Sequence, residues 1–343
     1  SGLQYIRNCS EVARQGLYVQ LDAYRAHVFL DFQIVEEDEK GSWQQVHDAL
    51  NGRGIADMKA LQWQLPLRPV LKPLGEILNG SYFHYLVEQR PRVYTEIVPE
   101  PFLNEAVHKL ENLIRGAAEL LGRELDCTKP CAEFRSKLIA LFYVEWLDAL
   151  RPDLALPELR ELSSYLRLHT SPYTWLAAIG WLFMEGLRSA LSMDVERFGS
   201  LLDEWRVFPL IEETLQKAGF LKEMDGDIRA SLLFMNSIEG WLKKSSRTSP
   251  GTSMGSLLMD PKVREFLKVN DYKGKTWFNQ ERAETAFLWM AFEGAMEVLQ
   301  RSKPTAKQTQ RQLERLSTLI MQFQNTAEAC GYELQRFQEL LDQ

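Results

Sequence analysis

The stretch LERLSTLIMQFQNTAEACGYELQRFQELL, residues 313–341, decides the fold class. Its apolar residues recur at alternating steps of three and four, which is the spacing of one face of a long helix. The members of this seam are Leu313, Leu316, Ile320, Phe323, Ala327, Cys330, Leu334, Phe337 and Leu341. We expect the seam to pack on the rest of the chain or, alternatively, on a second copy or another domain. Gly331 inside the seam favours packing within the chain, because glycine permits close approach but weakens a free helix.

The same helical period continues upstream to about residue 100, which predicts a mainly α fold, a multi-helix bundle. Breakers and caps place the helices at about 101–122, 131–150, 157–168, 172–192, 195–219, 227–243, 256–268, 279–301 and 306–341. Pro209 should kink or split the fifth of these. Two polar stretches rich in breakers, 243–256 and 302–310, are predicted to be loops.

The segment before this helical domain, residues 41–99, reads as short helices and a proline-rich connector. A helix from residue 43 to Gly52 and a second near 55–64 are expected. Pro66, Pro69 and Pro73 follow so closely that we expect no long helix before about Val70.

Residues 1–40 are the one part of the chain with a strand period. In GLYVQLDAYRAHVFLDFQIV, residues 16–35, the even positions from Tyr24 to Ile34 are mostly apolar, and Arg25, His27, Asp31 and Gln33 lie opposite. Residues 17–21 can form a first strand and 22–25 a turn, which predicts a small N-terminal β-hairpin. A lone hairpin is marginal in water, so it needs further strands or a covering helix.

Composition restricts the function classes. Apolar residues make up 45% and charged residues 25% of the 343 residues, as in globular proteins. The net charge of −7 argues against nucleic-acid binding, and the longest apolar run, 174–184, is too short to span a membrane. Four scattered cysteines favour a cytoplasmic protein over a disulfide framework. The start at Ser1, without Met, suggests a piece of a longer chain.

No catalytic motif, cofactor loop or metal-binding spacing is recognisable, so we assign no catalytic residue, no metal and no cofactor. The adjacent carboxylates Asp203–Glu204 and Glu212–Glu213 diverge on a helix and fit a solvated surface. His84 and Glu88 lie one helical turn apart and can form a structural pair. Cys127 and Cys131 lack a second pair of ligands nearby that would complete a zinc site.

One aromatic turn is a candidate for carbohydrate binding. In NDYKGKTWFNQE, residues 270–281, Tyr272, Trp277 and Phe278 lie among amides and charges. Sugar rings stack on aromatic faces beside hydrogen-bonding groups, because their C–H face is apolar and their rim is polar. The alternative is that Trp277 and Phe278 fill the core beneath the turn.

Three segments carry a resemblance to a known family: LYVQLDAYRAHVFLDF, LLDEWRVFPLIEETLQKAGF at 201–220, and LLMDPKVREFLKVNDYKGKTWFNQERAETAFLWMAFEGAMEVL at 257–299. They resemble the C-terminal region of large bacterial glycoside hydrolases of the α-amylase superfamily, in which the catalytic barrel comes first and a small sheet follows it. The resemblance implies that residues 17–35 belong to or join that sheet. The family's catalytic Asp, Glu and Asp have no counterpart here, so the resemblance implies an accessory region.

The sequence therefore predicts a non-catalytic helical accessory region of an α-glucan-acting glycoside hydrolase, whose partners are the catalytic domain of the same protein or α-glucan. A first alternative is a helical scaffold protein that associates with a partner through the C-terminal seam, and this partner can be a second copy in a homodimer. A second is a stand-alone enzyme with a site between helices, near His84, Glu88 and His108.

Overall fold

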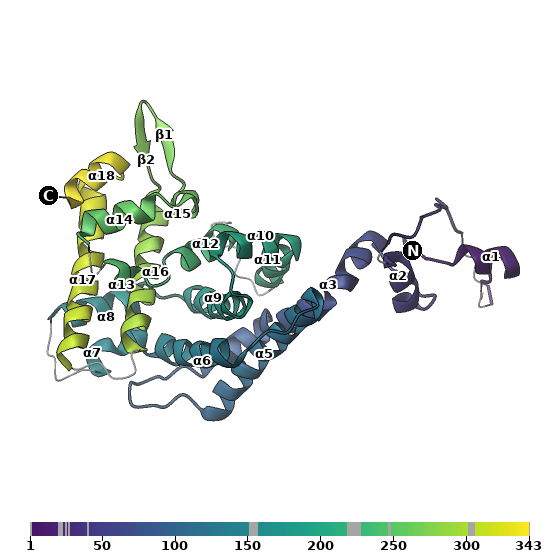
Figure 1. Ribbon diagram of the computed structural model, residues 1–343, viewed down its shortest axis with the longest axis horizontal. Helices are drawn as coiled ribbons and strands as arrows, with labels where there is room; N and C mark the ends of the chain where they lie inside the picture. The colour runs from purple at the N-terminus through teal and green to yellow at the C-terminus, as the bar shows by residue number, and fades with distance from the viewer. Residues whose placement is uncertain are drawn as a thin grey trace.

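The computed structural model describes residues 2–19, 23–24, 26, 28–39, 41–150, 157–217, 228–245, 248–300 and 306–342. The mainly α fold with a small β-hairpin is confirmed (Figure 1). The first helices are α1 (Cys9–Gln15), α2 (Ser42–Leu50), α3 (Met58–Ile77), α4 (Gly80–Glu88), α5 (Glu100–Leu121) and α6 (Thr128–Tyr143). A 3₁₀ turn (Val144–Trp146), α7 (Leu147–Leu150), α8 (Pro157–His169), α9 (Pro172–Leu191), α10 (Val195–Glu204) and α11 (Val207–Lys217) follow.

The C-terminal part contains the remaining elements. They are α12 (Ile228–Ser237), α13 (Trp241–Ser245), α14 (Pro250–Leu258), α15 (Pro261–Phe266), β1 (Asn270–Tyr272), β2 (Lys275–Trp277), α16 (Gln280–Leu299), α17 (Ala306–Ala329) and α18 (Leu334–Leu341). The stretch 243–256, predicted to be a loop, contains the end of α13 and most of α14, because Ser249 caps α14 and Pro250 starts it. The predicted helix around Pro209 is split into α10 and α11, as expected.

A large hydrophobic core holds most of the helices together in one unit, which we call the body. This core begins at Val70 in α3 and ends at Leu341 in α18, so α4 and the second half of α3 share it with the helices after residue 100. Helix α16 lies inside the body and is buried on nearly every side, which explains its almost continuous apolar sequence (Figure 1). In the described residues no helix is both long and apolar enough to cross a membrane.

The proline-rich segment was predicted wrongly, because α3 runs without interruption through Pro66, Pro69 and Pro73. Each proline removes one intrahelical hydrogen bond and costs about 3 kcal/mol in a helix interior. Tertiary packing outweighs this cost, since Val70, Leu74 and Ile77 are buried against the body. Local propensity alone could not reveal that compensation.

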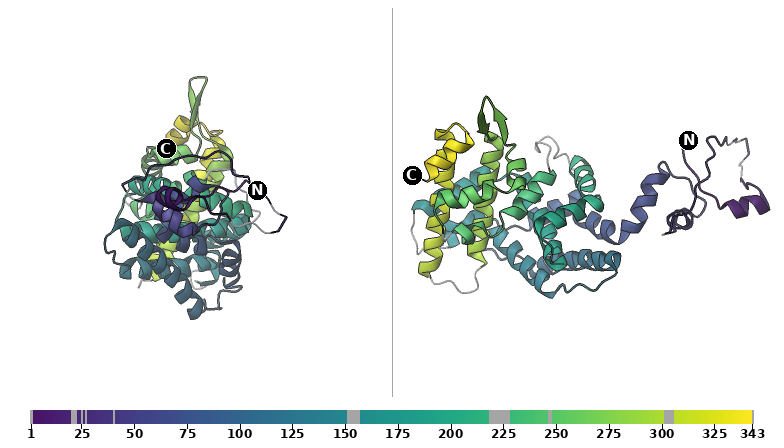
Figure 2. Two further views of the ribbon diagram at one scale, coloured as in Figure 1. Left: turned by 90° about the vertical axis from the view of Figure 1, so that its right-hand side faces the viewer. Right: turned by 45° about the horizontal axis from the view of Figure 1, so that its top comes forward.

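The part of the chain up to the first turns of α3 forms a separate arm, which we define as the described residues 2–65. Its small core consists of Val46, Leu50 and Met58, with Ile6, Trp43, Ile55, Leu61 and Leu65 packed around them. Figures 1 and 2 show the arm extending from one end of the body through α3. An isolated antiparallel bridge between Gln4 and Ile55 closes it.

The hairpin does not lie where the strand period placed it. The described residues among 17–35 form no strand, and Tyr24 and Asp31 adopt φ values of 63° and 58° that interrupt an extended chain. The hairpin is instead formed by β1 and β2, around a turn at Lys273 and Gly274. The apolar alternation at 24–34 therefore predicted a hairpin that the described residues of this segment do not form, because strand residues need a neighbouring strand to pair with.

The C-terminal seam is divided between two helices. Helix α17 ends at Ala329, Gly331 and Tyr332 take positive φ values, and α18 restarts at Leu334, so the predicted single helix 306–341 is broken at the glycine. The seam residues Leu313, Leu316, Ile320, Phe323, Leu334 and Phe337 are all buried by the rest of the chain. Their partners include α16 and α8.

Candidate functional site

The β1–β2 hairpin carries the aromatic residues singled out in the sequence. Its register pairs Asn270 with Trp277 and Tyr272 with Lys275, so Tyr272 and Trp277 are diagonal neighbours on one face. The Trp277 indole N–H donates to the Tyr272 carbonyl oxygen at 3.4 Å. Tyr272 is 61% exposed and Trp277 is half-buried, and the turn end of the hairpin projects beyond the helices (Figures 1 and 2).

Phe278 is separated from the other two aromatic residues. It is only 5% exposed, and its ring packs edge-on against Tyr332 and Phe337. Its backbone N–H donates to the Tyr332 carbonyl, which fixes the base of the hairpin on the turn between α17 and α18. An exposed stacking surface at this place therefore consists of Tyr272 and Trp277, with Phe278 as the anchor beneath them.

Two lysines border the exposed rings. The Lys273 ammonium lies 5.0 Å from the centre of the Tyr272 ring, and that of Lys275 lies 5.9 Å from Trp277. Lys275 also pairs with Glu333 at 2.7 Å, which ties β2 to the start of α18. Each ammonium therefore lies over the face of its aromatic ring, as in a cation–π contact, and has to move aside before another group can stack on that face.

The apolar residues at 28–34 lie at the surface of the arm. Val28, Leu30, Phe32 and Ile34 are between 76% and 87% exposed. An array of large apolar side chains at this level of exposure is unusual for a protein surface and is typical of an interaction site. Among the described residues of 23–35 only Phe29 is partly buried, with its ring edge-on to Tyr5.

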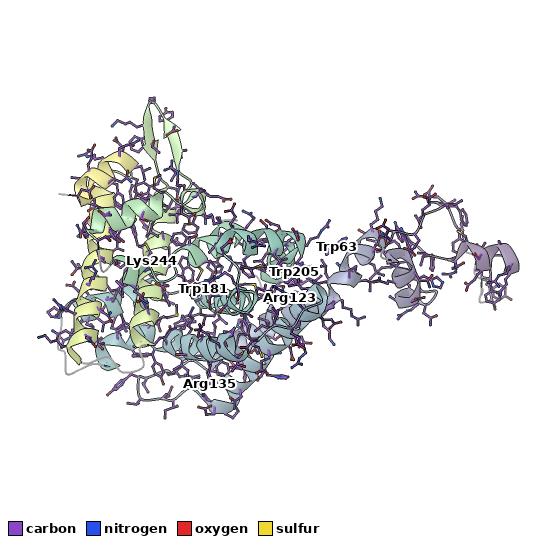
Figure 3. All side chains as sticks on the ribbon, viewed as in Figure 1. Trp63, Arg123, Arg135, Trp181, Trp205 and Lys244 are labelled. Atoms are coloured by element: carbon purple, nitrogen blue, oxygen red, sulfur yellow. The ribbon has the colours of Figure 1, made fainter. Side chains whose placement is uncertain are left out.

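A buried ionic cluster inside the body was not foreseen. Lys137 on α6 lies 3.1 Å from Glu185 on α9 and 2.8 Å from Glu239, which follows α12. Arg188 donates to Glu239 at 2.5 Å and lies 3.5 Å from Glu185. Lys137 also lies 5.7 Å from the ring of Trp181, which Figure 3 places in the middle of the body.

The charges in this cluster are set by burial and pairing together. Burial raises the pKa of Glu185, despite its contact with Lys137. Burial opposes the ionisation of Glu239 as well, but Lys137 and Arg188 outweigh it and lower its pKa. For Lys137 the two carboxylates prevail over burial and raise its pKa. The cluster therefore holds an ammonium and a guanidinium between carboxylates.

Glu293 on α16 lies next to this cluster and is 7% exposed. Its Oε1 accepts the backbone N–H of Gly240 at 2.7 Å, whereas its Oε2 and the Trp181 indole N–H have no partner in the described part of the chain. Both residues line a cavity with about 10 Å³ for the centre of a water molecule, which suits one water at most. Burial raises the pKa of Glu293 to about 8.

The sequence offered one weak signal for this cluster, namely that Glu185 and Arg188 interrupt the longest apolar stretch. Its other members are separated by up to about 150 residues, so only the fold brings them together. The cavity is far too small for a substrate, and the cluster functions as a structural link between α6, α9, α12 and α16.

His108, Cys127 and Cys131 were further candidates in the sequence. His108 lies 3.5 Å from Glu111 on the same helix rather than facing a distant carboxylate. Cys127 and Cys131 are free thiols, and burial raises the pKa of Cys131 to about 12. In the described ranges no three His, Cys, Asp or Glu side chains are grouped so that they could hold a metal ion.

Comparison with known proteins gave no family, no curated relative and no solved structure that matches this chain.

Proposed function

We propose that this chain is a non-catalytic, mostly helical accessory region of an α-glucan-acting glycoside hydrolase, and that it binds glucan on the β1–β2 hairpin. The observation that carries the proposal is the shared, outward face of Tyr272 and Trp277. The resemblance of three sequence segments to the C-terminal region of such enzymes supports the choice of glucan as ligand.

A ring-stacking role fits the chemistry of the hairpin face. A pyranose ring can lie with its C–H face on Tyr272 and Trp277 once the Lys273 and Lys275 ammonium groups move from over these rings, and the displaced ammonium groups can then donate to its hydroxyls. The anchor residue Phe278 and the ion pair of Lys275 with Glu333 hold the hairpin in place, so the hairpin loses little conformational freedom on binding.

The exposed segment 28–34 supports an accessory role as well. Its side chains alternate as in a strand of a half-buried sheet, and they gain about 25 cal/mol for each Å² of apolar surface that a partner removes from water. We propose that a sheet edge in the catalytic portion of the enzyme is this partner, which would fix the orientation of the helical body.

Affinity electrophoresis in gels with and without glycogen or soluble starch tests the glucan proposal. We expect the polysaccharide to slow the wild-type chain, and Trp277→Ala and Tyr272→Ala to restore its mobility. Tyr94→Ala is the matched control, because Tyr94 is an exposed tyrosine in the loop before α5. No retardation at high polysaccharide concentration, or equal retardation of Trp277→Ala with an intact circular dichroism spectrum, refutes glucan binding at the hairpin.

Size-exclusion chromatography of the chain mixed with the catalytic barrel of the enzyme tests the proposed docking of the segment 28–34. We expect the two proteins to elute together, and the double change Phe32→Ser and Ile34→Ser to abolish this co-elution. That result supports docking through the segment 28–34. Co-elution that the double variant retains shows that another surface makes the contact.

The scaffold alternative loses its main support, since the seam that suggested it is covered by α16 and α8 of the same chain.

A further inference from the structure

The arm and the body are two separate packing units that meet in a single helix. The core of the arm ends with Leu65 and the core of the body begins with Leu67 and Val70, and the two cores share no residue in the described chain. Helix α3 contributes to both, so its middle turn carries the connection between them (Figure 1).

That middle turn lacks part of its backbone hydrogen bonding. Pro66, Pro69 and Pro73 have no N–H to donate to the carbonyls of Gln62, Leu65 and Pro69. A helix resists bending through these bonds, and helices bend where prolines remove them. The carbonyls that lose a proline as donor lie on both sides of the boundary between the two cores.

One side-chain contact bridges the junction from arm to body. The guanidinium of Arg206 lies 4.4 Å from the centre of the Trp63 ring. Arg206 stands between α10 and α11 with a φ of 52°, and its N–H donates to the carbonyl of Asp203 at 3.0 Å. Figure 3 places Trp63 at the end of the body from which the arm extends.

We propose that α3 is a hinge at Pro66–Pro69 on which the arm swings relative to the body, and that the Trp63–Arg206 contact is the latch that holds the arm in the orientation seen here. The hinge does not depend on glucan binding. It gives the exposed segment 28–34 a range of positions, which the contact of Trp63 with Arg206 restricts.

Double electron–electron resonance between spin labels on the two units tests the hinge. The labels are placed at Asp48→Cys on α2 and Glu119→Cys on α5, both exposed, in a background with Cys9→Ser and Cys127→Ser. Cys131 and Cys330 are buried and can remain. We expect Trp63→Ala to broaden the distance distribution or add a second peak.

A second variant acts in the opposite direction. Pro66 is exposed, so Pro66→Ala restores an N–H to the helix without removing core packing, and we expect it to narrow the distribution. Arg197→Ala, which removes an exposed arginine from α10, is the control for a general effect of charge and should leave the distribution unchanged. The same narrow distribution in the wild type, Trp63→Ala and Pro66→Ala refutes the hinge and shows that α3 is a rigid rod.

Discussion

The carbonyl oxygen of Pro69 in α3 lies against the α-carbon of Gly116 in α5, so closely that a Cβ at position 116 would stand 1.9 Å from that oxygen. Pro73 cannot donate to this carbonyl, because proline has no N–H. The contact with Gly116 lets the two helices approach, and a Cα–H group faces the oxygen that the helix leaves without a partner.

Gly116→Ala should therefore destabilise the protein by about 3 kcal/mol, because the new methyl meets backbone that cannot move aside. Urea unfolding followed by circular dichroism measures the change. Gly180→Ala in α9 is the control, since a Cβ there meets nothing within 4 Å and alanine favours the helix by up to about 1 kcal/mol. Equal stability of both variants would show that α3 and α5 are not in close contact.

Glu293 should make stability fall as the pH rises. Burial disfavours the carboxylate and raises the pKa of Glu293 in the folded chain to about 8, from its ordinary value of 4.5. Between these values the folded state binds more protons than the unfolded state, so the free energy of unfolding decreases with pH and the penalty is complete above about pH 8. The groups that surround Glu293 are Glu297, Glu239 and Lys137, with the N–H of Gly240 on Oε1.

The variant Glu293→Gln keeps an oxygen for the Gly240 N–H and removes the ionisation. It should be more stable than the wild type at pH 8 by roughly 3 kcal/mol, and the difference should shrink toward pH 5. Urea unfolding of both proteins at the two pH values provides the measurement. A difference that is independent of pH would mean that Glu293 titrates normally in the folded protein.

Lys137 is the cation between two buried carboxylates, so Lys137→Met should destabilise the protein by about 3–5 kcal/mol. The loss comes mainly from leaving Glu185 buried with only the more distant Arg188 as a cationic partner, and adding Glu185→Leu should recover part of it. Lys217→Met removes an exposed pair with Glu213 and should cost less than about 0.5 kcal/mol. Thermal unfolding of the four proteins decides whether the network is as buried as its geometry indicates.

The sequence predicted those features whose causes are local. Helical period, caps and breakers depend on neighbouring residues, so the mainly α fold and the division of the helix around Pro209 into α10 and α11 could be found. The continuous α3 could not, because burial of Val70, Leu74 and Ile77 outweighs the cost of the prolines. The buried ionic cluster was equally out of reach, since Lys137, Glu239 and Glu293 come from distant helices.

Exposure of the segment 28–34 predicts that its apolar side chains contribute nothing to the stability of this chain. The double change Phe32→Ser and Ile34→Ser should leave the free energy of unfolding within about 0.5 kcal/mol of the wild type, because the side chains of Phe32 and Ile34 already face water. It should also lower the fluorescence of a bound hydrophobic dye, since the exposed apolar array is the surface that the dye binds. Phe323→Ser, in the buried seam, provides the contrast and should cost about 3–5 kcal/mol. Loss of stability in the double variant comparable to that of Phe323→Ser would mean that the segment packs on the chain itself, and the proposed docking on a partner sheet would lose its basis.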